Sequence, residues 1–251
     1  MKQNIYDHPD FFAGYQSLRD DDTGLNGALE EPAMRRVLPN LAGTSILDIG
    51  CGFGNFAAYA LNEGVSSYLG VDISKRMIDV ARSRFKQPAL KFINQAIEDL
   101  DIEAAAFDVV ISSMCFHYVS DYSGIVAKAK TGLRENGVLI FSVEHPICTA
   151  LLCGWHQNEA GIKLHWPIDR YKDEGKRVSK WFVDDVIKYH RTIETYINVL
   201  IGHGLMISCL LEPTAQEEAI RMRPELKEHA RRPPVLIVVA SKTEKRDALV
   251  I

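Results

Sequence analysis

The sequence predicts an α/β protein with a doubly wound, seven-stranded, mostly parallel sheet. Three observations predict this class. Short apolar runs alternate with helical patterns along most of the chain, and the runs are apolar on both faces, as in parallel strands that helices cover from both sides. A glycine-rich turn at residues 50–54 separates the first run from the helix after it. The length of 251 residues fits a single domain, residues 1–251.

The apolar runs predict seven strands, at about residues 45–49, 67–71, 90–94, 107–113, 138–143, 205–211 and 235–240. Helical patterns lie between them, at about residues 30–38, 55–63, 74–84, 121–134 and 192–203. Ser74 and Thr192 are suitable N-cap residues for two of these helices, because a hydroxyl accepts a hydrogen bond from a free helical N–H. Glu135-Asn136-Gly137 predicts a turn before the fifth strand.

Residues 144–190 interrupt this alternation. The stretch is too long for a simple connection and contains all three tryptophans, Trp155, Trp166 and Trp181. It follows the fifth strand, at the edge where ligands bind in open α/β sheets. We therefore interpret it as a lid insert over a substrate. A structural insert, or one that forms a homodimer, is the alternative.

Composition and charge argue against several classes of protein. The net charge of −4 gives no general attraction to nucleic acid or to an anionic membrane, and no run reaches the roughly 18 apolar residues of a membrane span. The five cysteines lack metal-ligand spacing, so no metal site is expected. Reduced thiols and a start without an apolar signal region predict a cytoplasmic protein.

The most informative segment is Ile46–Gly54, which reads ILDIGCGFG. An apolar run ends in Asp48, and three glycines follow at every second position, which allows a sharp turn and a close approach of the backbone to a ligand. The spacing departs from the dinucleotide fingerprint G-x-G-x-x-G. Asp48 would repel a pyrophosphate but suits a cationic ammonium group. Asp72 ends the next apolar run, where a ribose is held in doubly wound sheets.

S-adenosylmethionine has an ammonium group, a ribose and no phosphate. The motif with Asp72 resembles that of the class I S-adenosylmethionine-dependent methyltransferases, of the type that acts on small molecules. The resemblance covers residues 40–143 strongly and 190–242 loosely. It implies a Rossmann-like methyltransferase fold and S-adenosyl-L-methionine as cofactor. Ser112-Ser113-Met114-Cys115 stands where enzymes that methylate nucleobases or glutamine amides have an Asn-Pro-Pro-Tyr-like motif, which counts against those acceptors.

Carried over residue by residue, the resemblance implies a cofactor site along the ends of the first four strands. The glycine turn and Asp48 would cradle the methionine portion, Asp72 the ribose, and the residues after the second and third strands the adenine. In the N-terminal segment 1–28, which we expect to cover the cofactor, Tyr15 and Arg19 are one helical turn apart; a surface helix is the alternative. The predicted cofactor-binding residues are Tyr15, Arg19, Asp48, Gly50, Cys51, Gly52, Asp72, Ile73, Met77, Ala96, Ile97 and Ser113.

The candidate catalytic residues follow the fourth and fifth strands. Methyl transfer from a sulfonium is an in-line displacement, so the protein mainly positions the acceptor and excludes water. A base is needed only when the acceptor keeps its proton. His117, Glu144 and His145 are the candidates. A packing role for His117 and a turn at Glu144-His145-Pro146 that holds the lid are the alternatives.

The sequence thus favours an enzyme that methylates an oxygen or nitrogen of a small molecule. The alternatives are an RNA or protein methyltransferase and a non-catalytic S-adenosylmethionine-binding protein. A nicotinamide-dependent oxidoreductase is disfavoured by Asp48 and by the early third glycine. The sequence does not identify the methyl acceptor.

Overall fold

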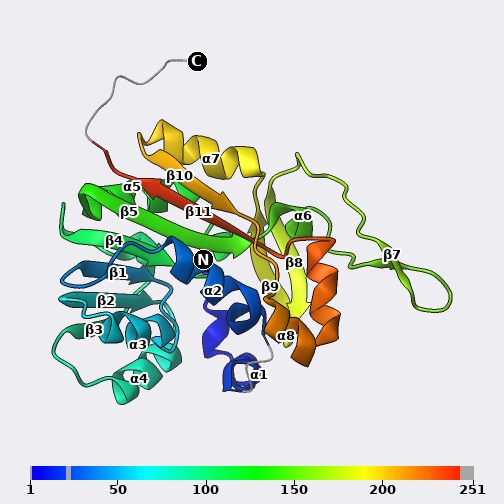
Figure 1. Cartoon of the computed structure of the whole chain (residues 1–251), viewed down its shortest axis with the longest axis horizontal. Helices are drawn as coiled ribbons and strands as arrows, with labels where there is room; N and C mark the ends of the chain where they lie inside the picture. Colours follow the sequence, from blue (N-terminus) through cyan, green and yellow to red (C-terminus); the bar gives the residue numbers. More distant parts are fainter. Residues whose placement is uncertain (1, 21–23, 244–251) are drawn as a thin grey trace.

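A seven-stranded sheet forms the centre of the protein (Figure 1), which we describe from a computed structural model of residues 2–20 and 24–243. The strand order is β10-β11-β5-β4-β1-β2-β3, and β11 runs antiparallel to both of its neighbours while the other pairs are parallel. The strands are β1 (Ser45–Ile49), β2 (Ser67–Asp72), β3 (Leu90–Asn94), β4 (Phe107–Ser112), β5 (Leu133–Glu144), β10 (Met206–Leu211) and β11 (Val235–Ser241). The predicted seven-stranded, mostly parallel sheet is confirmed.

The fifth strand begins earlier than predicted. β5 starts at Leu133, which pairs with Phe107, and the ladder with β4 is irregular until Val109 pairs with Val138. Asn136 has a positive φ of 64°, so the predicted turn residues form an irregularity within the strand rather than a loop before it. Asn136 N–H donates to the carbonyl of Lys242, which ties this irregularity to the end of β11.

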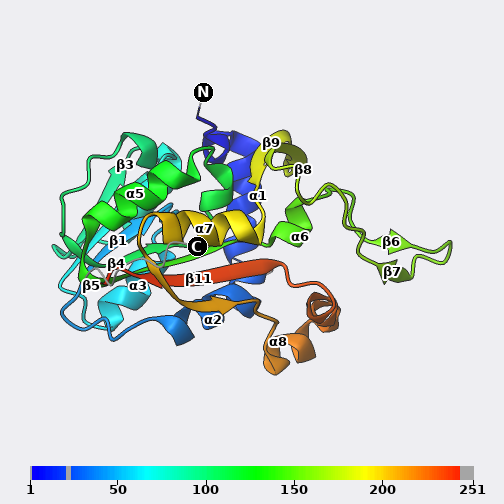
Figure 2. The ribbon, with the colours of Figure 1, turned by 90° about the horizontal axis from the view of Figure 1, so that it is seen from above.

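Helices cover both faces of the sheet (Figure 2). One face is covered by α2 (Glu31–Val37), α3 (Asn55–Asn62) and α4 (Lys75–Arg84), and the other by α5 (Tyr122–Gly132) and α7 (Ile193–Gly202). Successive residues of β1 serve the two layers, since Ile46 packs into the first core and Leu47 into the second, both fully buried. This is why the central runs are apolar at every position.

Two predicted N-caps are confirmed. Ser74 Oγ accepts a hydrogen bond from Met77 N–H, and Thr192 Oγ1 accepts one from Thr195 N–H. Each satisfies a donor that the first turn of a helix leaves free.

The segment after β5 divides into two hairpins. Following α6 (Pro146–Thr149), the short strands β6 (His156–Gln157) and β7 (Lys163–His165) form an arm that projects from the body, as Figures 1 and 2 show from two directions. The second hairpin, β8 (Gly175–Trp181) with β9 (Val183–His190), lies against the N-terminal segment, where Phe11 contacts Trp181 with 5.2 Å between ring centroids. The stretch predicted as one lid is therefore two structural units.

The remaining elements are short helices around the sheet edge and its last strands. They are η1 (Ile5–Asp7), α1 (Pro9–Asp20), η2 (Asn26–Glu30), η3 (Ile97–Asp99), η4 (Phe116–Tyr118), α8 (Glu217–Met222) and η5 (Pro224–Ala230). Within residues 2–20 and 24–243, no helix has the length and apolar character needed to span a membrane.

The cap of α5 offers a test of local stability. Asp121 Oδ1 accepts a hydrogen bond of 2.8 Å from Gly124 N–H. We expect Asp121→Ala to lower the free energy of unfolding by about 1 kcal/mol, the usual cost of losing an N-cap, in urea denaturation. Asp79→Ala is the control, because it removes only an exposed ion pair with Lys75 and should change the free energy by less than about 0.5 kcal/mol. Equal losses in both variants would contradict a capping role.

Candidate functional site

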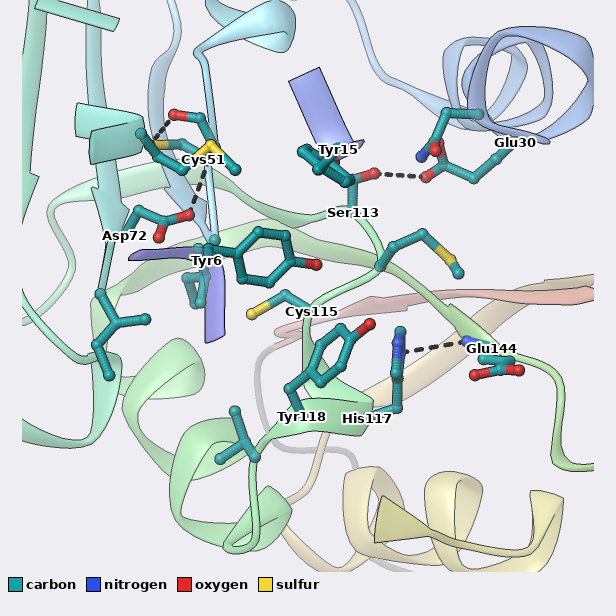
Figure 3. Close-up of a pocket in the computed structure, with 18 of the residues that line it drawn as sticks. Tyr6, Tyr15, Glu30, Cys51, Asp72, Ser113, Cys115, His117, Tyr118 and Glu144 are labelled. Atoms are coloured by element: carbon teal, nitrogen blue, oxygen red, sulfur yellow. Dashed lines mark hydrogen bonds between the residues drawn. The ribbon is translucent and has the colours of Figure 1, made fainter. Parts of the chain in front are cut away.

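A cavity of about 880 Å³ lies at the carboxyl ends of the central strands. Figure 3 shows Asp72 and Cys51 on one side of it and His117 and Glu144 on the other. The sequence-predicted residues that line this cavity are Tyr15, Arg19, Asp48, Gly50, Cys51, Gly52, Asp72, Ile73, Met77, Ala96, Ile97, Ser113, His117 and Glu144. Of the predicted site residues, His145 does not line it.

The glycine turn brings backbone to the cavity wall. Gly50 and Gly52 have φ values of +77° and +53°, a region that disfavours other residues. A Cβ on Gly50 would lie 2.6 Å from Cys115 Sγ, whereas a Cβ on Gly52 would meet nothing within 4 Å. Gly50 thus allows the loops after β1 and β4 to approach each other, and Gly52 presents its backbone to open space.

Asp72 joins the loops that follow β1 and β2. Its Oδ2 accepts a hydrogen bond of 2.9 Å from Gly52 N–H, and its Oδ1 accepts one of 2.8 Å from Ser74 N–H. Burial raises the pKa of Asp72 to about 6, although these two hydrogen bonds oppose the shift. The carboxylate therefore fixes the glycine turn as well as facing the cavity.

Asp48 is a buried carboxyl group at the end of β1. It is 3% exposed, and the Tyr68 hydroxyl donates a hydrogen bond of 2.5 Å to its Oδ2. Burial is the main cause that raises the pKa of Asp48 to about 7, and repulsion from Asp72 and Glu30 adds to it. A cation placed nearby would stabilise the ionised form.

The sequence analysis missed Glu30 as a site residue. Glu30 lines the cavity, is 1% exposed, and accepts hydrogen bonds from the hydroxyls of Ser113 at 2.8 Å and Ser142 at 2.6 Å. Burial raises the pKa of Glu30. The sequence does contain a signal for Glu30. Ala33 and Met34, three and four residues later, are apolar, and this helical spacing places Glu30 on the buried face of the predicted helix.

The three carboxyl groups of Glu30, Asp48 and Asp72 have no basic partner among residues 2–20 and 24–243, since no lysine or arginine nitrogen there lies within 4 Å of them. Arg19, which also lines the cavity, pairs instead with Glu31 at 2.7 Å. Buried acidic groups without counterions favour a cationic ligand. This end of the cavity therefore fits a group such as an ammonium or a sulfonium.

Apolar residues line the neighbouring wall. Met77, in α4, is 1% exposed, and Ala96 and Ile97 are buried beside η3. Together with Ile73 they border the cavity next to Asp72. The arrangement provides a flat apolar surface beside a carboxylate, which suits a nucleoside base next to its ribose.

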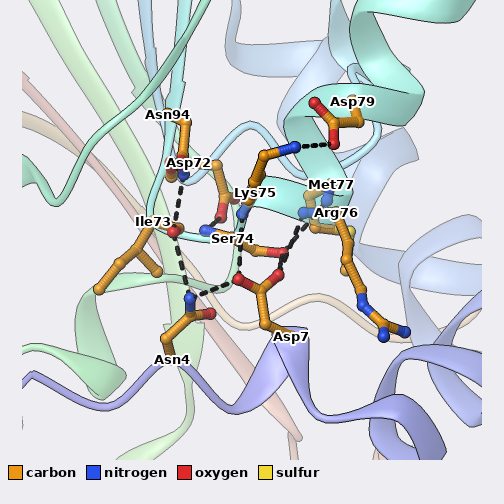
Figure 4. A network of polar contacts seen from close by, with 10 residues as sticks. All are labelled: Asn4, Asp7, Asp72, Ile73, Ser74, Lys75, Arg76, Met77, Asp79 and Asn94. Atoms are coloured by element: carbon orange, nitrogen blue, oxygen red, sulfur yellow. Dashed lines mark hydrogen bonds and ion pairs between the residues drawn. The ribbon is translucent and has the colours of Figure 1, made fainter.

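The N-terminal segment closes the cavity from one side. Tyr6 and Tyr15 line it, and Tyr6 contacts Tyr118 with 6.1 Å between ring centroids. Asp7 anchors this segment, as Figure 4 shows: its carboxylate accepts hydrogen bonds from Ser74 Oγ and from the backbone N–H groups at the start of α4. Burial opposes ionisation of Asp7, but these hydrogen bonds outweigh it and lower its pKa.

His117 lies at the far end of the cavity. Its Nδ1 accepts a hydrogen bond of 3.3 Å from Glu144 N–H, so in this tautomer the ring proton is on Nε2. Burial lowers the pKa of His117, and Lys188 and Arg191 lower it further. His117 is thus a neutral donor here, while the base role predicted for it needs the other tautomer and stays a prediction. Glu144 pairs with Lys188 at 2.6 Å.

His145 serves local structure in this fold. It is 1% exposed, its Nδ1 accepts a hydrogen bond from Ile147 N–H as the N-cap of α6, and its Nε2 is 2.7 Å from Glu212 Oε1. Both ring nitrogens are engaged away from the cavity. This position does not support the catalytic role predicted from the sequence. His145 directly follows β5, but its side chain points toward the first turn of α6, which it caps.

Comparisons with known proteins agree with this geometry. The profile of a family described as "Methyltransferase domain" matches residues 47–141. An S-adenosylmethionine-dependent methyltransferase from Mesorhizobium loti is 38% identical, with a TM-score of 0.81 over 87% of this chain and 100% of that one. A protein assigned to the same class from Listeria monocytogenes is 40% identical, with a TM-score of 0.82 over 86% of this chain and 97% of that one.

An uncharacterized protein of Haemophilus influenzae is 35% identical over 97% of this chain and 99% of its own length. A malonyl-[acyl-carrier protein] O-methyltransferase from Paenibacillus is 36% identical, but the match spans only 40% of this chain and 39% of that protein. The fold and the cavity define an α/β enzyme that binds a cationic nucleoside. The chain belongs to the class I S-adenosylmethionine-dependent methyltransferases, and S-adenosylmethionine is its cofactor.

Asp72 provides a direct test of the predicted cofactor site. We expect Asp72→Ala to weaken binding of S-adenosylhomocysteine by about 1.5–3 kcal/mol, the range for losing hydrogen bonds to a charged group, in calorimetric titration. Asp79→Ala is the matched control, because Asp79 is an exposed carboxylate on the adjacent α4. Unchanged affinity in Asp72→Ala would show that this carboxylate does not hold the cofactor.

The raised pKa values predict how cofactor affinity depends on pH. The ligand-free enzyme keeps protons on Asp48 and Asp72 up to about pH 7 and 6, and a bound cation favours the ionised forms and releases these protons. We therefore expect affinity to be highest above pH 7 and to fall as the pH drops through both values. Calorimetry at a series of pH values measures this.

Asp48→Asn is the control for this pH effect. It removes Asp48, whose pKa is raised to about 7, so the pH dependence that remains should follow Asp72 and Glu30. Affinity that is constant with pH, or that rises as the pH falls, would contradict the assignment of these carboxyls to the cation site.

Proposed function

We propose that this methyltransferase transfers the methyl group of S-adenosylmethionine to an oxygen or nitrogen of a small molecule held in the same cavity. The observation that carries the proposal is that one cavity of about 880 Å³ continues from Asp48 and Asp72 to His117, Glu144 and Lys188. Its volume is in the range of small-molecule sites. The far end is therefore available to an acceptor when the acidic end holds the cofactor.

The acidic end would orient the cofactor. When bound, S-adenosylmethionine supplies a methyl group on a positively charged sulfur, which needs no further activation. Asp48 and Glu30 would bind its positive charge, Asp72 its ribose, and Ile73, Ala96 and Ile97 its adenine. Ser113, directly after β4, lines the cavity between these residues and His117 and would face the reacting part of the cofactor.

The far end would position the acceptor. His117, with its Nδ1 engaged by Glu144 N–H, would have Nε2–H available as a donor to the acceptor, and the Glu144–Lys188 pair supplies both signs of charge. The bound cofactor would supply its methyl group to the acceptor's lone pair, with S-adenosylhomocysteine as the leaving group, and a proton on the attacking atom would pass to solvent. Holding the acceptor in line is the main contribution of the protein to such a displacement.

The aromatic wall would exclude water. We assign this covering role to residues 2–20 and 24–28, the described part of the predicted 1–28 cover, together with the β8–β9 hairpin. Residues 1 and 21–23 of that prediction lie outside the described residues. Tyr6, Tyr15 and Trp181 line the cavity from these two segments. The β6–β7 arm and its two tryptophans have no part in this wall.

An RNA or protein acceptor is the alternative. The net charge of −4 and the replacement of the proline-containing motif by Ser112-Ser113-Met114-Cys115 weigh against it. The name of the matched O-methyltransferase is consistent with an oxygen acceptor, but the match covers less than half of that protein.

Transfer of a labelled methyl group decides between these acceptors. The enzyme is incubated with methyl-labelled S-adenosylmethionine and a cell extract separated into small molecules, RNA and protein. We expect enzyme-dependent label in the small-molecule fraction, with Asp72→Ala as the control that lowers it. Label confined to RNA or protein would overturn the proposal, and label in no fraction while the cofactor binds would favour a non-catalytic binder.

A further inference from the structure

Arg232 lies at the acceptor end of the cavity, just before β11. Pro234 C=O accepts a hydrogen bond of 2.9 Å from His145 N–H, and Val235 pairs with Glu144 across the β11–β5 ladder. These contacts place Arg232 beside the end of β5, and its side chain lines the cavity.

The cations around the cavity are paired with carboxylates, with one exception. Six lysines and arginines of the described residues line it: Lys2, Arg19, Arg35, Lys180, Lys188 and Arg232. Lys2 pairs with Asp99, Arg19 and Arg35 with Glu31, Lys180 with Asp184, and Lys188 with Glu144. Among residues 2–20 and 24–243, no carboxylate oxygen lies within 4 Å of the Arg232 guanidinium.

The groups that do contact Arg232 carry no charge to balance it. Its guanidinium lies 4.3 Å from the ring centre of Trp166, donates to Cys148 Sγ, and has Nη2 3.4 Å from His229 Nδ1. Burial raises the pKa of the Cys148 thiol to about 11, and burial together with Arg232 lowers the pKa of His229, so both are neutral near pH 7. Arg232 Nε is buried and has no hydrogen-bond partner.

We propose that the methyl acceptor carries a carboxylate group and that Arg232 binds it. Arg232 is partly buried, where a charge without a counterion is less well solvated than at an open surface, and a planar guanidinium matches a carboxylate with two parallel hydrogen bonds. Among the described residues, the Nη2 group of Arg232 has only a long contact of 3.4 Å to His229 Nδ1, so a carboxylate in the cavity would supply the anionic partner that the guanidinium lacks.

The charge balance favours a carboxylate over a phosphate. Glu144 already neutralises Lys188, so Arg232 contributes a single positive charge that a monoanion matches. The two ends of the cavity then have opposite polarity, negative at Asp48 and Asp72 and positive at Arg232. This arrangement orients a cationic cofactor and an anionic acceptor toward each other, and it disfavours the reversed placement.

The inference rests on the proposed function, and its test uses ligands that do not require the true acceptor. The full-length enzyme is first titrated with S-adenosylhomocysteine. Acetate and benzoate are then titrated against this complex by calorimetry at constant ionic strength, each beside its neutral amide, acetamide or benzamide, and beside hydrogen phosphate. We expect at least one carboxylate to bind saturably, more tightly than its amide and than phosphate.

Variants connect this preference to Arg232. Arg232→Met keeps an apolar chain against Trp166 and should weaken carboxylate binding about ten- to a hundredfold, while S-adenosylhomocysteine binds as before. Arg232→Lys keeps the charge without the fork and should retain part of the affinity. If Arg232→Met does not fold, the comparison of Arg232→Lys with wild type applies. Arg35→Gln is the control, because that arginine pairs with Glu31, and it should preserve the carboxylate preference.

The outcomes separate the two proposals. Equal binding of carboxylate and amide, no saturable carboxylate binding, tighter binding of phosphate, or a preference that survives in Arg232→Met would overturn the carboxylate site. A carboxylate preference that depends on Arg232 in an enzyme that does not bind S-adenosylhomocysteine would support this site and contradict the proposed methyl transfer.

Discussion

The hydrogen bonds of Asp72 organise the acidic end of the cavity. One carboxylate oxygen holds Gly52 N–H in the turn after β1, and the other holds Ser74 N–H at the start of α4. The two loops that must face one ligand are thus fixed by a single side chain at the end of β2. Because this carboxylate is partly withdrawn from water, its ionisation and the geometry of the turn depend on each other. A glycine-rich turn alone does not define a binding site; the acidic group that braces it makes the site rigid.

Charged groups of the cavity are likewise placed for a ligand rather than for each other. Within the described part of the chain, carboxyl groups without counterions gather at the ends of β1 and β2, and an arginine without a counterion lies beside the end of β5. The fold tolerates these unpaired groups because the apolar layers on both faces of the sheet supply its stability. Pairing each of them internally would stabilise the empty protein and remove the charge that a ligand recognises. Sites of this kind retain electrostatic cost in the free state that a bound ligand offsets.

Much of the fold followed from local pattern, while the less predictable parts depended on contacts between distant segments. The strand runs and the N-caps Ser74 and Thr192 are encoded by neighbouring residues, and the loops after parallel strands necessarily share one edge. The apolar residues after Glu30 mark its helix face as buried, but its partners Ser113, directly after β4, and Ser142, in β5, are distant in the sequence, so its place at the cavity was missed. His145 was expected at the cavity because it follows β5, and strand order fixes where that strand ends. Strand order does not fix where the side chain points, and His145 does not line the cavity. The hairpins of residues 144–190 carried no strong turn or period signal by which they could be divided.

The aromatic wall of the cavity also depends on contacts between segments that are distant in the sequence. The Gln3 side chain exchanges two hydrogen bonds with the backbone of Ile187 in β9, and Phe11 packs against Trp181. Asp7 joins the same N-terminal segment to the start of α4, next to the turn that Asp72 holds. The two segments therefore contact each other, and the N-terminal one attaches to the loop after β2, although Gln3 and Ile187 are 184 residues apart in the sequence. Ser74 connects that loop to the N-terminal segment, because its hydroxyl accepts from Met77 N–H and donates to Asp7. The wall of the cavity and the turn held by Asp72 are for this reason connected by one chain of hydrogen bonds.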